Sequence, residues 1–367
     1  MITSYERLRR AFFHEEMDRP AVTMLSLELM PKDSSYDKLA NYIESNWDLS
    51  RRGINSNNLE TQYLVDTVTE KTPEGYERII DTLHTPMGNL TATGVVNLPG
   101  QPALPETYFI KSIQDAEKYL SLPIPKPGGD ITPYYINKKA MGDRGIVDVR
   151  IGENPAGFTS GLMGSELFAL FSVTNRDIIH ALCERRMTII LNRLKFVHEQ
   201  KLGPFFSMGG EELVVPPLHG PKDFYDFNYK YDKPIIDLIH EGGGRIHIHC
   251  HGALKTVLHY FVEMGADVIH PIEGAPTDTM TVAEAKEIIR GKICMHGNIQ
   301  LADFYEKTPD EIRTQTLLLI KQGFDDRQGL MVAPTATPYS NGEGDKCFEQ
   351  FKAMTETVQA CPKTLQS

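Results

Sequence analysis

Three histidines alternate with isoleucine and cysteine in the segment Arg245-Ile-His-Ile-His-Cys-His-Gly252. Alternation with a period of two is typical of a β-strand, and it predicts that His247, His249 and His251 share one face of that strand. Imidazoles at positions i and i+2 near the end of a strand can bind one transition metal or one anionic substrate. One or two of these histidines could instead be core groups, but three within five positions favour a ligand or substrate role.

Acidic, amide and imidazole side chains also follow other apolar segments. These motifs are Gly-Gly-Glu-Glu (209–212), His-Pro-Ile-Glu (270–273), His-Gly-Asn (296–298) and Pro-Thr-Ala-Thr (334–337). Functional side chains at the carboxyl ends of successive parallel strands are typical of a (β/α)8 barrel. Loop polarity alone would not select glutamate, histidine and asparagine so consistently over serine, lysine and glycine.

The elements that carry these motifs alternate regularly after residue 140. Apolar runs lie at 146–151, 204–208, 245–250, 267–270, 292–296 and 329–333, and helical patterns at about 177–201, 221–241, 253–264, 281–290 and 309–322. This alternation predicts a parallel βα repeat, and strands from the first half bring the total to about eight. We therefore predict an α/β fold, a (β/α)8 TIM barrel that forms one domain over residues 1–367. A doubly wound sheet is the competing fold, but the GxGxxG and GxxxxGK(S/T) motifs are absent.

The first half of the chain is less regular. Residues 3–15 have helical spacing and 21–27 form a buried strand, whereas 63–90 indicate an antiparallel β meander. The meander has turns at 72–75 and 86–89, and connectors rich in proline and glycine at 97–107 and 122–133 frame a short helix near 112–120. We interpret residues 33–140 as an inserted helical and β-meander elaboration with a lid-like role over one end of the barrel.

Composition restricts the class of protein. The chain is 41% hydrophobic and 24% charged, as in an ordinary globular enzyme, and its formal net charge of −11 argues against a nucleic-acid surface. Five scattered cysteines without a CxxC pair indicate reduced thiols in a cytoplasmic protein. We expect neither secretion nor a membrane span, since residues 1–10 lack the apolar segment of a signal peptide and no stretch of eighteen apolar residues occurs.

Five motifs in this order resemble the uroporphyrinogen decarboxylase superfamily. They are Asp18-Arg19-Pro20, Glu211-Glu212 with Pro216-Pro217 after it, His249-Cys-His-Gly252, His270-Pro-Ile-Glu273 and Gly297-Asn298-Ile299. The resemblance covers nearly the whole chain and is more specific in the second half. It implies a (β/α)8 barrel with one of two activities, porphyrinogen decarboxylation or zinc-dependent methyl transfer between a small methylated compound and a corrinoid.

The decarboxylase branch of that superfamily has an arginine-rich segment, Met-Arg-Gln-Ala-Gly-Arg, after its first strand. It binds the carboxylates of the tetrapyrrole. This chain has Leu25-Ser-Leu-Glu-Leu-Met-Pro31 there, without arginine. Because a macrocycle with many carboxylates needs cationic partners, the resemblance favours the corrinoid-dependent methyltransferase branch.

The methyltransferase branch places a His-x-Cys pair on the middle strand and another cysteine near the last strand as zinc ligands. His249 and His251 match the pair, so the second ligand is imidazole, and residues 330–337 contain no cysteine. We therefore expect a zinc site of His249, His251 and a carboxylate from Glu273, with Glu212 as the alternative third ligand. Such a nitrogen and oxygen set suits an oxygen substrate, for which zinc with an open position is a Lewis acid.

The remaining motif residues receive roles by their chemistry. Glu211 and Glu212 would face opposite ways in extended chain, and we expect Glu212 to point inward as a general acid. Asn298 would orient the substrate or cap the next helix, while His270 is expected to support a ligand from behind. Cys294 is expected in the core.

Together these expectations predict a zinc-dependent O-demethylase component. It would move a methyl group from a small methoxylated substrate to the Co(I) of a separate corrinoid protein, since the Asp-x-His-x-x-Gly motif that would hold a corrinoid is absent from this chain. The competing interpretations are a uroporphyrinogen-type decarboxylase and a non-catalytic corrinoid or metal carrier, because a fold alone does not guarantee activity.

Overall fold

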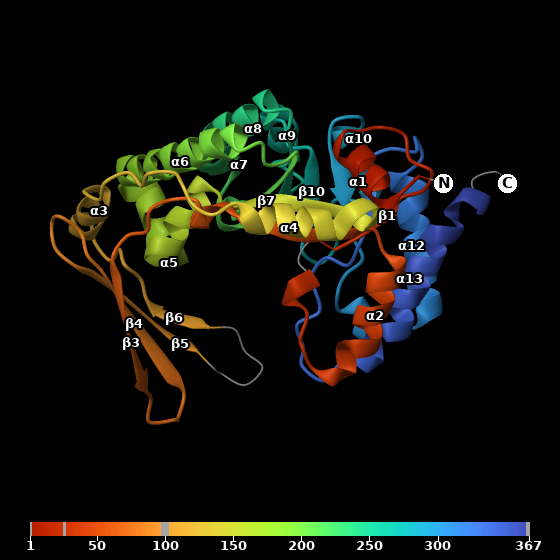
Figure 1. Cartoon of the computed structure of the whole chain (residues 1–367), viewed down its shortest axis with the longest axis horizontal. Coiled ribbons are helices and arrows are strands. Elements are labelled where there is room, and N and C mark those ends of the chain that lie inside the picture. Colours follow the sequence, from red (N-terminus) through yellow and green to blue (C-terminus); the bar gives the residue numbers. More distant parts are fainter. Residues whose placement is uncertain (1, 25–26, 97–102, 365–367) are drawn as a thin grey trace.

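Eight parallel strands form one curled sheet in the computed structural model, which describes residues 2–24, 27–96 and 103–364 (Figure 1). The order β1-β12-β11-β10-β9-β8-β7-β2 makes consecutive strands from β7 to β12 neighbours in space. The strands are β1 (Ala21–Val22), β2 (Leu49–Asn55), β7 (Gly145–Glu153), β8 (Phe205–Gly209), β9 (Arg245–His249), β10 (Val268–His270), β11 (Cys294–His296) and β12 (Leu330–Val332). The parallel βα repeat predicted after residue 140 is confirmed.

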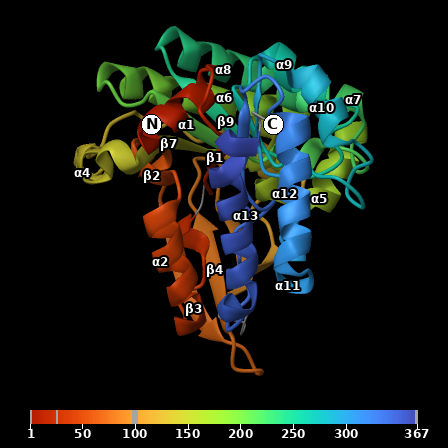
Figure 2. The same ribbon diagram turned by 90° about the vertical axis from the view of Figure 1, so that its right-hand side faces the viewer.

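Helices connect these strands and cover the outer face of the sheet (Figures 1 and 2). They are α5 (Pro155–Thr174), α6 (Arg176–Glu199), α7 (Pro221–Asp223), a π-helical segment (Phe224–Tyr229), α8 (Lys230–Glu241), α9 (Leu258–Met264), α10 (Val282–Ile289), α11 (Asp303–Glu306), α12 (Pro309–Gly323) and α13 (Gly344–Thr364). Capping boxes begin α10 and α12, since Thr281 and Thr308 exchange hydrogen bonds with Glu284 and Glu311. Only α9 begins well inside its predicted range of 253–264.

Helix α5 has no counterpart among the predicted helices. It is the one described helix that is long and apolar enough to cross a membrane, but 56% of its apolar window is buried inside the protein. It packs along α6, so it is a core helix. Its helical period is broken at Gly164, where φ is 79° and the ring of Tyr108 occupies the place of a side chain.

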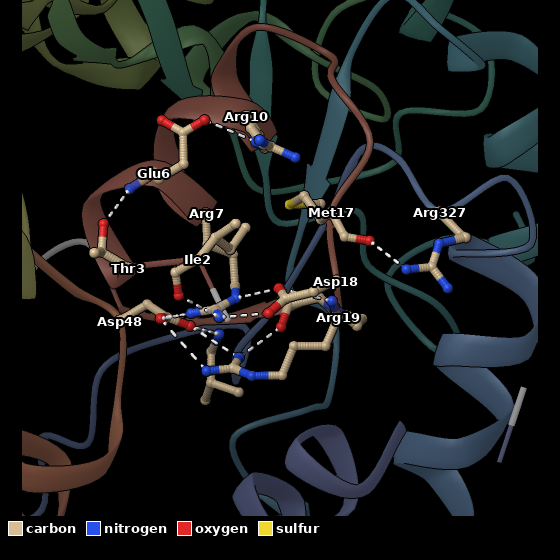
Figure 3. Close-up of polar contacts among 12 residues, drawn as sticks. Ile2, Thr3, Glu6, Arg7, Arg10, Met17, Asp18, Arg19, Asp48 and Arg327 are labelled. Carbon is tan, nitrogen blue, oxygen red and sulfur yellow. Dashed lines mark hydrogen bonds and ion pairs between the residues drawn. The ribbon is translucent and has the colours of Figure 1, made fainter. Parts of the chain in front are cut away.

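The two edge strands of the sheet, β1 and β2, are linked by hydrogen bonds around Asp48, the residue before β2. Within the described residues no strand ladder links β1 to β2, although the Asp48 nitrogen donates to the Val22 carbonyl at 2.9 Å and the Val22 nitrogen donates to the Asp48 carboxylate at 3.0 Å. Arg7 and Arg19 contact that carboxylate at 2.6 and 3.0 Å, and Arg7 also holds Asp18 (Figure 3). We call Arg7, Asp18, Arg19 and Asp48 the seam cluster. The predicted α/β fold is thus confirmed as a curled, eight-stranded parallel sheet that is similar to a TIM barrel, with no strand ladder between its two edges in the described residues.

Helix α1 (Ser4–Phe12) covers the amino-terminal end of the curled sheet. Its Phe12 ring packs edge-on against Phe205 with centroids 5.1 Å apart, and lies beneath His247. The helix predicted at 3–15 is confirmed, and it stops a few residues short. Helix α1 therefore closes the amino-terminal end of the sheet, and the carboxyl-terminal end remains as the usual place for a site.

The β meander forms a second, antiparallel sheet in the order β3-β4-β5-β6. Its strands are β3 (Val65–Lys71), β4 (Glu77–Leu83), β5 (Leu90–Val96) and β6 (Leu104–Thr107), and the helices of the first half are α2 (Asp37–Asn46), α3 (Ile113–Leu120) and α4 (Thr132–Met141). This sheet extends from the same side of the barrel as α2 and α13 (Figures 1 and 2). The meander and both of its predicted turns are confirmed, whereas part of the predicted lid connector, 97–102, lies outside the described residues.

Candidate active site at the carboxyl ends of the strands

A cavity of about 350 Å³, here called the mouth cavity, opens at the carboxyl ends of the parallel strands. Its lining residues are Met24, Leu29, Arg52, Arg150, His249, His251, His270, Ala336, Thr337, Pro338 and Tyr339. A larger groove of about 780 Å³ along α2 and β2 shares Arg52 with it but has no histidine in its lining. The imidazole chemistry therefore belongs to the mouth cavity.

Hydrogen bonds fix the tautomer of His249. His270 Nε2 lies 3.2 Å from the Pro334 carbonyl, which can only accept, so this nitrogen carries a hydrogen. Burial lowers the pKa of His270 well below its usual value, so the ring is neutral and its Nδ1 keeps a lone pair. His249 Nδ1 lies 3.0 Å from that atom and donates to it. The Nε2 of His249 is therefore left with a lone pair.

The pKa of His249 itself is lowered to about 4. Burial is the main cause, and the nearby charges of His251 and Arg150 add to it. The ring is therefore neutral near pH 7. A neutral imidazole with a free Nε2 can act as a metal ligand or accept a proton.

A second imidazole pair lies deeper in the barrel. His296 Nε2 donates to the Thr23 carbonyl at 3.2 Å, so its Nδ1 accepts from His247 Nε2 at 3.0 Å. Burial lowers the pKa of both rings, that of His296 to about 4. His247 is fully buried and packs on Phe12, so it belongs to the barrel interior rather than to the predicted ligand set.

His251 lies beyond the strand that was predicted to carry it. Strand β9 ends at His249, and His251 sits in the following turn with its ring centroid 4.8 Å from that of His249. Its Nδ1 is 3.3 Å from Glu273 Oε2, which also accepts from the Gly252 nitrogen at 3.0 Å. Glu273 raises the pKa of His251, and in return His251 and the Gly252 N–H lower the pKa of Glu273 although burial opposes them.

Glu211 and Glu212 occupy a short 3-10 helix (Glu211–Val214), so the expectation that they lie in extended chain is wrong. Their side chains nevertheless differ in surroundings. Glu212 Oε2 accepts from the Gly210 nitrogen at 3.0 Å, and burial raises its pKa while the charge of His251 opposes the rise. Glu211 is fully buried without a hydrogen-bond partner for either oxygen, and burial beside Asp232 raises its pKa well above the usual value. Burial thus raises the pKa of both carboxyls, more strongly for Glu211, and neither glutamate lines the mouth cavity.

Close backbone contact positions this acidic turn. Gly210 has φ +112°, and a side chain on Gly157 at the start of α5 would come within 2.7 Å of the Gly210 Cα. The side chain of Asn154 caps the same helix by accepting from the Gly157 nitrogen at 2.7 Å. The glycine pair therefore lets α5 pack directly on the turn that carries Glu212.

Three polar residues of the barrel interior were not identified from the sequence. Asp148 and Arg150 lie on β7 within a segment predicted only as an apolar run, and Arg52 comes from β2. Burial raises the pKa of Asp148 to about 6, and Ser207 donates a short hydrogen bond to it. The spacing of Asp148 and Arg150 at i and i+2 in a predicted strand was the signal that could have found them.

Asn298 lies at the end of β11 but does not line the mouth cavity. Its side-chain nitrogen donates to the Ile272 carbonyl at 3.0 Å. This bond ties the turn after β11 to the turn that carries Glu273. Asn298 is thus placed to hold the turn of Glu273 in position.

The donor types fit zinc, although the described residues contain no preassembled group of three or more metal-ligating side chains. His249 offers Nε2 with a lone pair, and His251 uses Nδ1 for Glu273, which leaves its own Nε2. A carboxylate that accepts from the far nitrogen of an imidazole is the usual support for a metal-bound histidine. Glu273 and Glu212 both remain as sources of a third, oxygen ligand.

The family model described as uroporphyrinogen decarboxylase (URO-D) matches residues 162–359, which is more than half of the chain. The chain belongs to the uroporphyrinogen decarboxylase family. The match contains the acidic turn and all three histidine motifs that line or support the mouth cavity. No curated protein sequence matches the chain.

Two solved structures align with most or all of the chain. A methyltransferase from Methanosarcina mazei aligns over 100% of both chains, with 14% sequence identity and a TM-score of 0.61. A B12-independent methionine synthase from Shewanella sp., solved in complex with selenomethionine, aligns over 83% of this chain and 77% of its own, with 13% identity and a TM-score of 0.40. The first of these likenesses shows a shared fold along the full length.

Proposed function

We propose that this member of the uroporphyrinogen decarboxylase family is a methyltransferase that works in the cytoplasm. It would move the methyl group of a small methoxylated compound to the Co(I) of a separate corrinoid protein. The observation that carries the proposal is the neutral His249, whose Nε2 lone pair is fixed by His270 next to the His251–Glu273 pair. The full-length likeness to a methyltransferase fold supports it.

His249 and His251 would hold zinc through their Nε2 atoms. Glu273 would serve as the oxygen ligand by turning away from His251 Nδ1, or Glu212 would supply the oxygen while Glu273 keeps its contact with His251. Bound there, zinc would act as a Lewis acid toward the ether oxygen of the substrate. Glu273 already orients His251, and Asn298 holds the turn of Glu273 through the Ile272 carbonyl. These contacts preserve the positions of the donors before a substrate arrives.

Glu212 supplies the proton in this proposal. Burial raises its pKa, which makes it a better proton donor to the departing ether oxygen than an exposed carboxyl would be. The carbon–oxygen bond breaks, the methyl group bonds to cobalt through the electron pair of Co(I), and the oxygen leaves as an alcohol or phenol after taking the proton. The chain's own contribution is to place the acid near His251 and to raise its pKa by burial.

The alternative, decarboxylation of a uroporphyrinogen, was disfavoured because residues 25–31 lack arginine. Arg52 and Arg150 line the mouth cavity, so the site does contain cations, and that argument is weaker than the sequence indicated. Two arginines are too few to pair with the many carboxylates of a uroporphyrinogen, and a cavity of about 350 Å³ is too small for its macrocycle. A carrier without catalytic activity would have no use for a buried carboxyl of raised pKa beside His251.

The test mixes the zinc-loaded protein, a reduced corrinoid protein and a panel of methoxylated compounds, and follows methyl-cobalt formation by absorbance. We expect at least one methoxylated compound to methylate cobalt. A parallel reaction with uroporphyrinogen should release no carbon dioxide. Methylation by a thioether or methylamine alone would refute the ether assignment, and coproporphyrinogen formation would favour the decarboxylase.

A further inference from the structure

Arg150 is a cation without a partner in the mouth cavity. Its side chain is half-buried on β7, yet no carboxylate or carbonyl of the described residues accepts a hydrogen bond from its guanidinium. The buried Arg7, by contrast, bonds to both Asp18 and Asp48. Partly desolvated guanidinium groups normally have an anionic partner.

The lining of the mouth cavity has a charge opposite to that of the whole chain. The chain carries a formal net charge of −11, but the cavity lining contains two arginines, three histidines and no carboxylate. Arg52 has a partly exposed partner, Glu28, at 3.3 Å, whereas Arg150 has none. The positive charge of Arg150 also contributes, after burial and the charge of His251, to the lowered pKa of His249. A cavity of this kind attracts an anion.

The rest of the lining is apolar and small. Met24, Leu29, Pro338 and Tyr339 provide a surface for a flat or aliphatic group, and about 350 Å³ is room for one ring with substituents. Arg150 and His249 lie on β7 and β9, two strands apart in the sheet. A ligand that holds its anion at Arg150 can therefore present another group to the imidazoles.

We propose that Arg150 binds the carboxylate of the methyl donor, with Arg52 in support, so that the substrate class is small methoxylated carboxylic acids with one ring. This assignment deepens the proposed methyl transfer and rests on it. The planar guanidinium can meet a carboxylate with two parallel hydrogen bonds, which a lysine cannot do. Arg150 is thus a specificity residue that turns the methoxy group toward His249 and His251.

Binding of benzoate tests the anchor without any methyl transfer. We expect calorimetry to detect benzoate binding to the zinc-loaded protein, and Arg150→Gln to weaken it on the order of 10- to 100-fold, as expected for a charged hydrogen-bonded pair. The benzoate affinity of Arg150→Lys should lie between those of the parent and of Arg150→Gln. Arg52→Gln should weaken benzoate binding less than Arg150→Gln does. Arg51→Gln is the matched control, because Arg51 lies on the same strand as Arg52 but is exposed and bonds to Glu44.

Thermal unfolding excludes a folding defect as the cause. Removal of an unpaired charge should leave the midpoint of Arg150→Gln unchanged or raise it. Equal benzoate affinity in the parent and in a folded Arg150→Gln variant would overturn the anchor.

Turnover separates this assignment from the proposed reaction. The parent should methylate cobalt from 4-methoxybenzoate at least 10-fold faster, by kcat/KM, than from neutral 4-methoxybenzyl alcohol, and Arg150→Gln should abolish that preference. If both compounds react equally in both proteins, the anchor is overturned while the methyl transfer stands. If benzoate binds through Arg150 but no methoxylated compound methylates cobalt, the methyl transfer fails while the anion site itself is supported.

Discussion

The seam cluster and the mouth cavity both bring charged side chains into the barrel, but only the seam pairs all of them. In the seam cluster, Arg7 and Arg19 share the completely buried Asp48. In the mouth cavity, Arg150 has no carboxylate partner among the described residues, and His249 beside it is neutral. Loss of one partner from a buried ion pair destabilises the fold, whereas an unpaired charge at a cavity indicates a ligand. The two regions should therefore respond differently to mutation.

Removal of both imidazoles should have the largest effect. We expect His249→Ala with His251→Ala to lose zinc and to reduce methyl transfer to the background rate, because two of the three proposed ligands are gone. The free energy of unfolding without metal should change little. Metal analysis and the methyl-cobalt assay measure both effects, and His259→Ala, at an exposed histidine on α9, is the control. Full zinc content in the double variant would contradict the proposed site.

Replacement of the proposed acid should have the next largest effect. Glu212→Gln removes the proton but keeps the size of the side chain, so methyl transfer should slow by ~10²–10⁴, the usual contribution of a positioned general acid. Zinc content should not change. If Glu212→Gln loses the metal instead, Glu212 is the third ligand and Glu273 becomes the candidate acid.

Substitution in the seam cluster should lower the stability of the fold and leave methyl transfer by the folded protein unchanged. Asp48→Ala leaves two arginines without their shared carboxylate, and we expect it to lower the free energy of unfolding by about 3–5 kcal/mol. Urea unfolding measures this change. Asp310→Ala, which breaks an exposed pair with Arg313, should cost at most about 0.5 kcal/mol. A folded Asp48→Ala protein that retains its stability but loses zinc would reverse the roles assigned to the two regions.

A fall in pH should lower the free energy of unfolding through the buried histidines before it affects the seam cluster. This effect is smaller than those above and increases gradually. His249 and His296 have pKa values of about 4 in the folded protein, against about 6.5 when unfolded, so the unfolded chain binds more protons below pH 6.5. Their stabilisation is complete above pH 6.5 and is lost as the pH falls toward 4, by up to about 1.4 kcal/mol per unit for each histidine. Arg7 lowers the pKa of Asp18 although burial opposes it, so the contribution of Asp18 is lost only at lower pH.

Urea unfolding at several pH values between 4 and 7 measures this slope. His296→Gln should have a shallower slope by about one proton, since glutamine does not titrate. An identical slope in the parent and the variant would show that His296 does not take part.

The sequence predicted the barrel better than it predicted the site. Period-two and helical patterns located β7 to β12 and most of their helices, since burial on one or both faces leaves a readable pattern. Helix α5 was missed because its apolar residues lie on all sides and Gly164 interrupts it. His251 lies beside His249 and contacts Glu273. The directions of the Glu211 and Glu212 carboxyls depend on a 3-10 helix that no local pattern indicated.

The residues missed at the site were those whose role depends on distant strands. Arg52 and Arg150 are 98 positions apart in sequence (150 − 52), and only the pairing of β2 with β7 brings both to one cavity. Asp148 was concealed within an apolar run. A single sequence contains no direct signal for contacts between side chains on different strands, because the register of strand pairing decides which side chains become neighbours.

The seam also affects the order in which the barrel can form. Val22 pairs with Val332, and Ala21 with Met331, across a separation of 310 residues (332 − 22), so this ladder cannot form on the ribosome until most of the chain has emerged. All four residues of the seam cluster lie within the first 48 positions. They can therefore join β1 to the start of β2 early in synthesis, and keep β1 in position until β12 has been synthesised and pairs with it.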